Sequence, residues 1–429
     1  MLIDLPTNFR KNKLMSTKSF NIPRSLINKA WLDVKSNAGS SGIDDETIAK
    51  FELNLDKNLY KLWNRMASGS YIPKPVKSVS IPKKDGSERI LGIPTVLDRI
   101  AQTVAKMILE PQIEPYFYKD SYGYRPNKSA LDAIGITRKR CWYDDWVLEF
   151  DIKGLFDNID HEMLMKAVKK YNQEKWIILY IERWLKCPMQ DSEGKITERG
   201  KGTPQGGVIS PILANLFMHY AFDRWISKNH PENKWCRYAD DGLIHCKTEE
   251  SAQKLLSELK IRMLECKLEV HPKKTKIIYC KDSSRKKDYP NTKFEFLGYE
   301  FRRRLVKNNK RNSLFVSFTP SISNSSLKSI KQKLKGLRVR KLYYLELQDV
   351  ANMINPALRG WINYYGKYNR SGLYTVFRQL NHKLVLWSRR KYKKLRRHKT
   401  QASEFMMRLS SQHPKLFAHW SSGMTGSFA

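Results

Sequence analysis

WCRYADDGLIHC (residues 235–246) places two acidic side chains between two short apolar segments. The Asp240-Asp241-Gly242 sequence is typical of a tight turn, and the flanking segments are typical of short strands. Neighbouring side chains on a straight strand face opposite ways, but at a hairpin turn both carboxylates can converge on one point. We therefore expect Asp240 and Asp241 to lie together at the end of a β-hairpin.

A third carboxylate follows another apolar segment. WVLEFDIKGLFDNID (146–160) predicts a strand that ends at Asp151 and continues through a turn into a helix. Three carboxylates held together repel one another unless cations lie among them, and hard divalent ions prefer oxygen ligands. An isolated Asp-Asp pair is more often an exposed turn, so the neighbouring motifs must decide between these interpretations.

Two motifs precede YADD (238–241): the run from Asp151 to Phe156, and GTPQGG (202–207). In this order and spacing, the three motifs closely resemble the palm of a reverse transcriptase. The resemblance implies two Mg²⁺ ions, with Mn²⁺ as a substitute, one activating a primer 3′-hydroxyl and the other holding the triphosphate. The implied catalytic residues are Asp151, Asp240 and Asp241, and the implied metal ligands are Asp151, Ile152, Asp240 and Asp241.

The same resemblance implies a dNTP-binding set. Phe156 matches the aromatic gate against a ribose 2′-hydroxyl, and Gln205 matches a residue of the nucleotide pocket. The other members are Lys83, Arg89, Gly206 and, in HPKKTK (271–276), Lys274. Lys84 competes with Lys83 for its role. Alternatively, Phe156 is an ordinary core aromatic, and the charges around Lys83 are simply solvated on the hairpin.

Three more stretches indicate the branch of the family. They are SYGYRPNKSALDAI (121–134), FEFLGYEF (294–301, a primer-grip region) and PALRGWINYYGKY (356–368). Together they resemble the group II intron-encoded reverse transcriptases, or maturases, over nearly the whole chain. The resemblance implies as partners a group II intron RNA, an RNA template, a DNA primer, target DNA and dNTPs. It leaves the oligomeric state open.

Composition agrees with a polyanionic partner. Lys and Arg total 79 against 42 Asp and Glu, a net charge of +37. We interpret Trp361 as core packing, although Trp361, Tyr364 and Tyr365 could form an aromatic face for nucleic acid. The candidate nucleic-acid-binding cations are Arg125, Arg359, Lys367, Arg389, Arg390, Lys391, Lys393, Lys394, Arg396 and Arg397.

The chain has no apolar segment long enough to span a membrane and no secretion signal. Its six cysteines stand singly, without a CxxC pair, so the sequence suggests neither a zinc ribbon nor a disulfide framework and favours free thiols in a reducing compartment. We expect a bacterial, cytoplasmic and nucleoid-associated protein without membrane partners, with an organelle-encoded gene as the alternative.

The expected fold is α+β: a right-hand polymerase whose palm holds a small antiparallel sheet, followed by an α-helical thumb. We expect an N-terminal extension (1–75), fingers and palm (76–319) and a thumb or maturase domain with a basic tail (320–429). Within these, we expect a hairpin around Asp85-Gly86, one helix over about 161–186, and thumb helices punctuated by Pro320 and Pro356.

Two departures from the family matter. Gly242 follows YADD where many members have an aromatic residue, and no paired cysteines follow the thumb. We therefore expect no HNH-type endonuclease, so that priming uses a nascent strand or a nick made elsewhere. Two rival functions remain: a splicing factor with an inactive polymerase site, which the intact aspartates disfavour, and a domesticated reverse transcriptase in host defence or repair.

Overall fold

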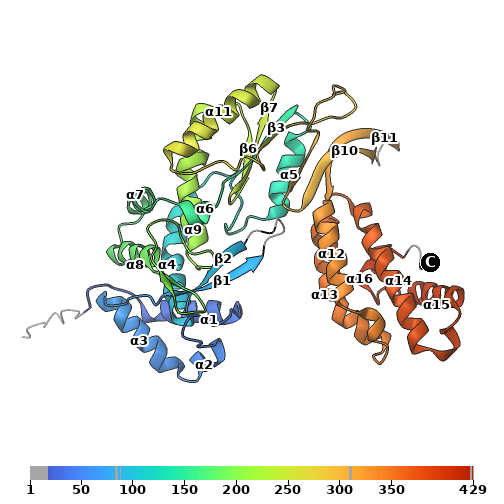
Figure 1. The fold of residues 1–429 in the computed structure, drawn as a ribbon, viewed down its shortest axis with the longest axis horizontal. Helices are drawn as coiled ribbons and strands as arrows, with labels where there is room; N and C mark the ends of the chain where they lie inside the picture. The colour runs from blue at the N-terminus through green and yellow to red at the C-terminus, as the bar shows by residue number, and fades with distance from the viewer. Residues whose placement is uncertain (1–17, 83–85, 87, 309–311, 426–427, 429) are drawn as a thin grey trace, which may run out of the picture. The chain divides into compact units, whose positions relative to one another are not determined.

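The computed structural model describes residues 18–82, 86, 88–308, 312–425 and 428 (Figure 1). Lys83 and Lys84 lie outside the described residues. The chain forms two compact units, each built from separate stretches of sequence. Unit 1 contains the residues up to Lys119, Ile152–Lys228 and Ile261–Glu269, and unit 2 contains Asp120–Asp151, Asn229–Lys260 and Val270–Ala429.

Unit 1 is mainly helical and has one small sheet with the strand order β2-β1-β4-β5. Its central helix is α4 (Val96–Ile113), and the side chains of Ile100, Ala101 and Val104 on this helix are buried. The strands are β1 (Val76–Pro82), β2 (Glu88–Ile93), β4 (Met189–Gln190) and β5 (Ile196–Thr197). The other helices are α1 (Arg24–Ser36), α2 (Ile48–Glu52), α3 (Leu55–Ser68), η1 (Glu114–Tyr116), α6 (Leu155–Asn158), α7 (His161–Tyr171), α8 (Lys175–Lys186), α9 (Ser210–Met218), η2 (His219–Asp223) and α10 (Arg224–Asn229).

Two local predictions for unit 1 have different outcomes. The hairpin is confirmed, since β1 and β2 pair antiparallel and Gly86 adopts a φ of 84°. The prediction of a single helix over about 161–186 is wrong, because the helix is interrupted between α7 and α8. At the break, Asn172 Oδ1 accepts a hydrogen bond of 2.8 Å from the Glu174 amide. This local bond competes with helix continuation.

The main sheet of unit 2 has the strand order β6-β7-β3-β8, and every neighbouring pair is antiparallel. Its strands are β3 (Trp146–Asp151), β6 (Trp235–Tyr238), β7 (Asp241–Cys246) and β8 (Lys276–Tyr279). Helices α5 (Ala130–Arg140) and α11 (Glu249–Glu265) accompany it, although the last residues of α11 belong to unit 1. The predicted α+β class with small antiparallel sheets is confirmed.

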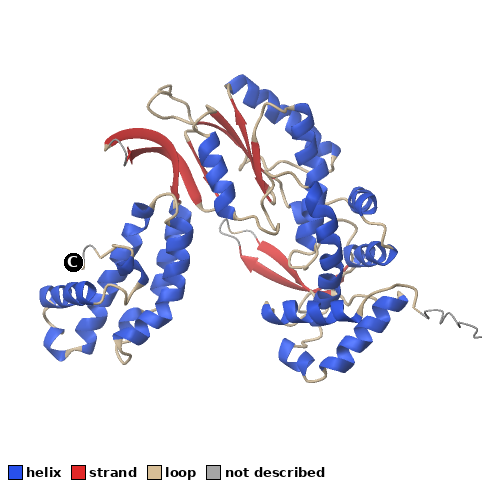
Figure 2. Cartoon of the chain, turned by 180° about the vertical axis from the view of Figure 1, so that it is seen from behind, coloured by secondary structure: helices blue, strands red, loops and turns tan. Residues whose placement is uncertain are grey.

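A second sheet in unit 2 has the order β11-β10-β9. It consists of β9 (Lys293–Phe296), β10 (Tyr299–Asn308) and β11 (Ser313–Ile322), and the last two strands form a curved ribbon (Figures 1 and 2). One core joins this sheet to α5 and the main sheet, with Ala133 from α5, Val147 and Leu243 from the main sheet, and Phe301 and Phe318 from the ribbon.

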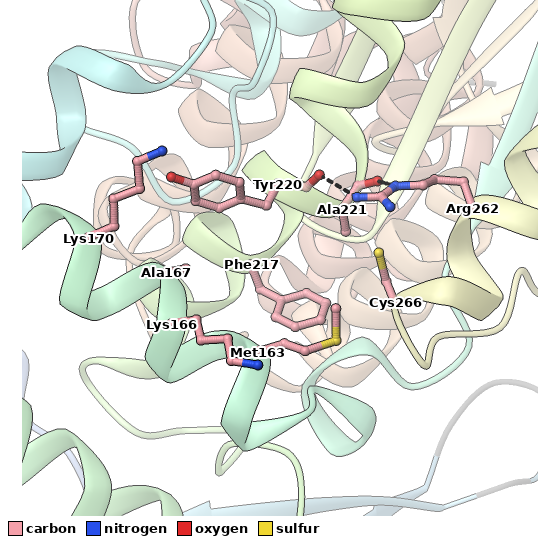
Figure 3. A pocket seen from close by; sticks show the side chains of 9 residues that line it. All are labelled: Met163, Lys166, Ala167, Lys170, Phe217, Tyr220, Ala221, Arg262 and Cys266. Carbon is pink, nitrogen blue, oxygen red and sulfur yellow. Dashed lines mark hydrogen bonds between the residues drawn. The ribbon is translucent and has the colours of Figure 1, made fainter.

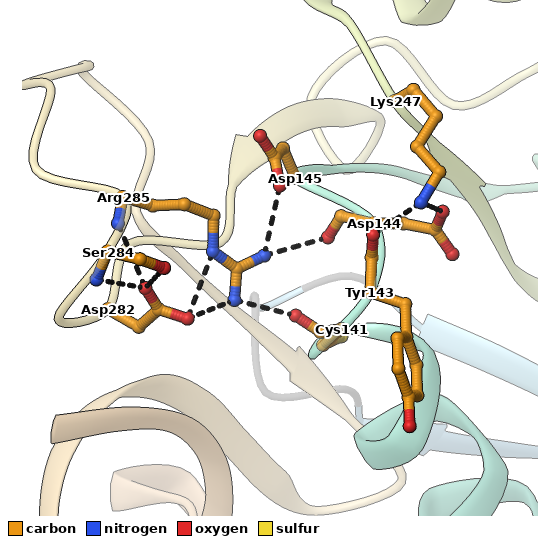
Figure 4. Close-up of polar contacts among 8 residues, drawn as sticks. All are labelled: Cys141, Tyr143, Asp144, Asp145, Lys247, Asp282, Ser284 and Arg285. Carbon is orange, nitrogen blue, oxygen red and sulfur yellow. Dashed lines mark hydrogen bonds and ion pairs between the residues drawn. The ribbon is translucent and has the colours of Figure 1, made fainter. Parts of the chain in front are cut away.

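A buried arginine ties a loop of unit 2 to the start of β3 (Figure 4). The Arg285 guanidinium donates to the carbonyl oxygens of Asp144 at 3.0 Å and Cys141 at 2.9 Å, and its Nε donates to Asp282 at 3.0 Å. Although burial opposes the charge of Asp282, the hydrogen bonds from Arg285 hold its pKa at about 2. Arg285 thus remains charged and paired while it supports the backbone that leads into the main sheet.

The thumb helices begin at Asn324, because residue 320 lies inside β11. Pro356 does not separate two helices but lies inside α13, whose buried residues Val350, Ile354 and Leu358 share one core on both sides of the proline. The helices of this region are α12 (Asn324–Gly336), η3 (Val339–Lys341), α13 (Leu347–Tyr365), η4 (Arg370–Leu373), α14 (Tyr374–Lys391), η5 (Lys393–Leu395), α15 (Lys399–Gln412) and α16 (Ala418–Ser421).

Two further sequence expectations concern the cysteines and the membrane. All six cysteines are free and buried. Within the part of the chain that the structure describes, no helix has both the length and the apolar character needed to cross a bilayer.

Candidate active site

The structure brings the three predicted aspartates together at one edge of the main sheet of unit 2. Asp151, at the end of β3, lies directly opposite Asp241, at the start of β7. Asp241 also pairs with Tyr238, so Ala239 and Asp240 form the turn between β6 and β7. Ala239 adopts a φ of 57°, in the left-handed region that L residues rarely occupy. The strained turn keeps Asp240 next to the Asp151–Asp241 pair.

A buried arginine, Arg237, supports the turn between β6 and β7. Arg237 is fully buried, and its guanidinium donates to the Ala239 carbonyl and to Ser121 Oγ, both at 2.9 Å. Gly123 packs against the same turn, where a Cβ would lie 2.5 Å from the Ala239 nitrogen. Our sequence reasoning missed Arg237. Its signal is a cation inside an otherwise apolar strand, WCRY.

A lysine supplies positive charge to the carboxylates. Lys274 Nζ lies 2.9 Å from Asp151 Oδ2. Although partial desolvation acts against it, the hydrogen bond and charge of Asp151 raise the pKa of Lys274, with help from Asp241 and Asp240. Desolvation raises the pKa of Asp241 to about 7, and the negative charges of Asp240 and Asp151 add to this effect. The three carboxyl groups therefore lie close enough to repel one another, and a cation between them is favourable.

The donor chemistry fits a hard divalent ion. Within the described residues, no three His, Cys, Asp or Glu side chains are arranged as a ready metal site. Even so, the raised pKa of Asp241 and the ammonium group against Asp151 show that the cluster holds a proton or a cation against its negative charge, a role that an oxygen-preferring metal ion can also fill. The Ile152 side chain is buried hydrocarbon, so only its backbone carbonyl could serve as a ligand.

Several predicted dNTP residues lie close together in unit 1. The Phe156 carbonyl accepts a hydrogen bond of 2.6 Å from the Thr203 amide, and Gln205 Nε2 donates to Asp157 at 2.9 Å. Gly206 adopts a φ of 122°, and a Cβ there would lie 2.7 Å from the Gly92 carbonyl oxygen. The chain after Asp151, the GTPQGG loop and the base of the finger are thus connected. Asp157 and Thr203 were missed by the sequence reasoning.

The remaining predicted nucleotide residues differ in position. Phe156 is half-buried, so it is not a fully buried core aromatic. Arg89 is exposed on β2, opposite Ile81. Lys83 lies outside the described residues. Gln102, which the sequence analysis did not predict, holds the end of the GTPQGG loop, because its Oε1 accepts a hydrogen bond of 2.8 Å from the Val208 amide.

Some of the cations predicted to bind nucleic acid form hydrogen bonds within the protein, and others have exposed side chains. Three are tied into the fold: Arg125 donates to the Ser121 carbonyl, Arg389 to the Arg396 carbonyl, and Lys391 to the Leu345 carbonyl and to Glu346. The exposed side chains are Arg359, Lys367, Arg390, Lys393, Lys394, Arg396 and Arg397, and Arg390 among them also lies over the Tyr343 ring, 4.4 Å from its centroid.

The aromatic residues of α13 and the turn after it serve packing inside unit 2. Tyr364 donates to the Leu297 carbonyl at 2.9 Å, and Tyr368 donates to the Leu131 carbonyl at 2.7 Å. Trp361 packs against the helical core, as predicted. The hydroxyls of Tyr364 and Tyr368 thus hold this region to the turn between β9 and β10 and to α5. The aromatic face of Trp361, Tyr364 and Tyr365 for nucleic acid stays a prediction.

The unusual Gly242 also has a structural explanation. Gly242 lies opposite Phe150 in the β3–β7 register, and a Cβ on Gly242 would lie 2.1 Å from a Phe150 ring carbon. The fully buried Phe150 ring therefore occupies the space where a side chain after YADD would start.

A separate cavity of about 330 Å³ lies in unit 1 between α7, the α9–η2 segment and the end of α11 (Figure 3). Phe217 and Lys170 are among the residues that line it. Arg262 donates to the carbonyls of Tyr220 and Ala221, both at 3.0 Å, where the π-helical turn η2 alters the helical hydrogen-bond pattern. None of the predicted site residues lines this cavity.

Comparisons with known proteins agree with this geometry. The family described as Reverse transcriptase (RNA-dependent DNA polymerase) matches residues 81–301, just over half of the chain, and the family Group II intron, maturase-specific domain matches residues 327–404. Protein YkfC of Escherichia coli is 30% identical over 332 residues, covering 67% of this chain and 82% of that protein.

Intron-encoded proteins are also similar. Group II intron-encoded protein LtrA of Lactococcus lactis is 27% identical over 436 residues, covering 82% of this chain and 69% of LtrA. Putative COX1/OXI3 intron 1 protein of Saccharomyces cerevisiae is 31% identical over 273 residues, covering 63% of this chain and 31% of that protein.

The fold, the aspartate cluster and the matched domains define an RNA-directed DNA polymerase. More closely, the chain belongs to the family of group II intron-encoded reverse transcriptases, in which the polymerase is followed by a maturase-specific domain.

Proposed function

We propose that Asp151, Asp240 and Asp241, with the Ile152 carbonyl, bind two Mg²⁺ ions and form the catalytic centre of DNA synthesis. When bound, the ions would activate the primer 3′-hydroxyl and stabilise the charge on the triphosphate. The observation that carries the proposal is the direct pairing of Asp151 with Asp241 beside the Asp240 turn. The paired strands hold the carboxylates before any ion arrives, which reduces the cost of binding.

We assign the dNTP contacts as follows. Arg89 and Lys83 of the finger would bind the triphosphate, while Gln205 and Gly206 would contact the incoming nucleotide. Phe156 is exposed enough to meet a ribose and would reject a 2′-hydroxyl. Lys274, already against Asp151, would neutralise charge next to the reacting phosphates. These roles agree with the local geometry in each compact unit.

The partners would be a group II intron RNA, an RNA template with a DNA primer, and target DNA. The exposed thumb cations Arg390, Lys393, Lys394, Arg396 and Arg397 would bind phosphates and make binding steeply dependent on salt. We propose three functional regions with the expected boundaries, 1–75, 76–319 and 320–429. The third would combine the roles of thumb and splicing maturase in an intron that moves by target-primed cDNA synthesis.

Primer extension on a defined RNA template tests the polymerase assignment. The wild type should copy the template with Mg²⁺ and dNTPs but not with rNTPs, and the Asp240→Ala, Asp241→Ala variant should be inactive while it still binds RNA. No product from either protein, with RNA binding retained, would instead support a splicing factor with an inactive polymerase site. Splicing of the intron that contains this gene, measured with and without the protein, tests the maturase role.

A further inference from the structure

The outer half of the β10–β11 ribbon is a two-stranded arm with open edges. Strand β9 pairs with β10 only from Tyr299 to Arg302. Beyond that point β10 pairs with β11 alone, up to Asn308 opposite Ser313. The base of the ribbon is held in the core by Phe301 and Phe318, whereas the outer part curves away from it (Figures 1 and 2).

Large apolar side chains are exposed on this outer part. Leu305 and Leu314 are each 65% exposed, and Phe315 is 46% exposed. Successive side chains of a strand alternate between faces. Leu305 pairs with Val316 on one face, and Phe315 pairs with Val306 on the other. Both faces of the arm therefore present apolar surface to solvent, which is unfavourable unless a partner covers it.

The arm is also cationic. In the two-stranded part, Arg303 and Lys307 are exposed, and the sequence has no acid in residues 303–308 or 313–319. Arg304 is largely buried and pairs with Glu300 at the base, which also pairs with Arg302. A second copy of this chain would bring two such arms together within molecules of charge +37, and like charges would oppose that contact. A polyanion satisfies both features, because cations can bind phosphates while apolar side chains contact bases.

The apolar groups also select among nucleic acids. In a fully paired RNA helix the base faces are stacked and hidden, whereas loops and bulges present unstacked bases to aromatic and apolar side chains. We propose that the outer β10–β11 arm binds structured RNA where a helix is interrupted by unpaired bases. Phe315 on one face and Leu305 and Leu314 on the other would contact bases, and Arg303 and Lys307 would contact the flanking phosphates. This inference rests on the proposed RNA partner but is independent of the polymerase site.

The test compares the full-length protein with an arm variant, Leu305→Thr, Leu314→Thr, Phe315→Thr. Threonine retains strand propensity, so the ribbon should persist. The matched control replaces exposed apolar residues elsewhere: Leu53→Thr, Ile72→Thr, Ile196→Thr, which are 81%, 74% and 55% exposed. Binding is measured by fluorescence anisotropy with two RNA probes of equal length, one fully paired and one with an internal loop of unpaired adenosines.

We expect the arm variant to lose about fivefold or more in affinity for the internal-loop RNA, since contacts to unstacked bases are worth that much. Its affinity for the paired RNA should change less than twofold, and the control variant should match the wild type on both probes. An equal loss on both RNAs, or no loss on either, would overturn the proposal. A wild-type dimer that becomes a monomer in the arm variant, measured by light scattering, would also overturn it.

Primer extension on a short RNA template separates this inference from the proposed function. The arm variant should extend the primer as the wild type does. If the wild type fails to extend but still discriminates between the two RNAs through the arm, the polymerase assignment fails and the arm proposal stands. If extension is normal and the discrimination is absent, only the arm proposal fails.

Discussion

Lys274 and Asp151 form an ion pair with 2.9 Å between Nζ and Oδ2, although 123 residues separate them in the chain. The pair exists because the HPKKTK loop folds back onto β3, where the His271 amide donates to the Asp151 carbonyl at 2.7 Å. The ammonium group therefore occupies a position next to a carboxylate that we assign to Mg²⁺. Lysine and metal should compete for the charge of Asp151.

This competition predicts opposite effects of Lys274→Gln on metal binding and on catalysis. The half-saturating Mg²⁺ concentration should fall by a factor of roughly 1.5 to 5, because exposed ion pairs are worth about 0.2–1 kcal/mol. The single-turnover rate should fall by roughly 10² or more if Lys274 assists the departing pyrophosphate. Rapid-quench experiments over a range of Mg²⁺ concentrations give both the half-saturating concentration and the rate, and an unchanged or higher half-saturating Mg²⁺ concentration in the variant would contradict the competition.

Metal binding should also depend on pH through Asp241. Because its pKa is raised to about 7, this carboxyl is protonated below neutrality and must release a proton to bind a cation. Mg²⁺ affinity should therefore fall as the pH drops below 7, by up to about tenfold per pH unit for one proton. Calorimetric titrations at pH 6, 7 and 8 measure the slope. Asp241→Asn should bind Mg²⁺ weakly with a flatter pH dependence, and affinity that increases in acid would contradict the assignment.

The stability of the main sheet should decrease as the pH rises. Desolvation raises the pKa of Glu149 to about 8, although Lys276 opposite it on β8 acts in the other direction. A raised folded-state pKa gives stability that is present below the unfolded value of about 4.3 and is lost as the pH rises through 8. Glu149→Gln stays neutral, so its melting temperature should fall less between pH 5 and 8 than that of the wild type without metal. Parallel curves would show that Glu149 is not responsible.

The contact between Phe150 and Gly242 predicts a steric cost. Gly242→Ala places a methyl group inside the Phe150 ring position and should destabilise the protein by about 1–3 kcal/mol. Adding Phe150→Leu should recover part of that loss. Gly360→Ala is the matched control, since nothing lies near its Cβ position in α13 and alanine favours a helix by about 0.5–1 kcal/mol. The melting temperatures of the wild type, the two Gly242→Ala proteins and the Gly360→Ala control provide the measurement. A Gly242→Ala variant as stable as the wild type would refute the contact between Phe150 and Gly242.

Much of the site could be predicted from local sequence. The apolar segments before Asp151 and around Asp240-Asp241 specify short strands and a turn through backbone preferences alone, and the charge of +37 specifies a polyanionic partner. The order of the motifs along the chain then identified the family. The strands and the turn could be predicted because each depends on residues within a few positions of one another, and the net charge and the motif order because both are properties of the sequence itself.

The structure alone decided how distant segments support one another. The bracing of the aspartate turn by Arg237 and the filling of the Gly242 position by Phe150 depend on strand register, which no single segment contains. The carbonyl partners of the Tyr364 and Tyr368 hydroxyls likewise come from distant segments, at Leu297 and Leu131. A side chain's role follows from what packs against it, and that neighbour is chosen by the fold as a whole because burial and hydrogen bonding are satisfied across the chain.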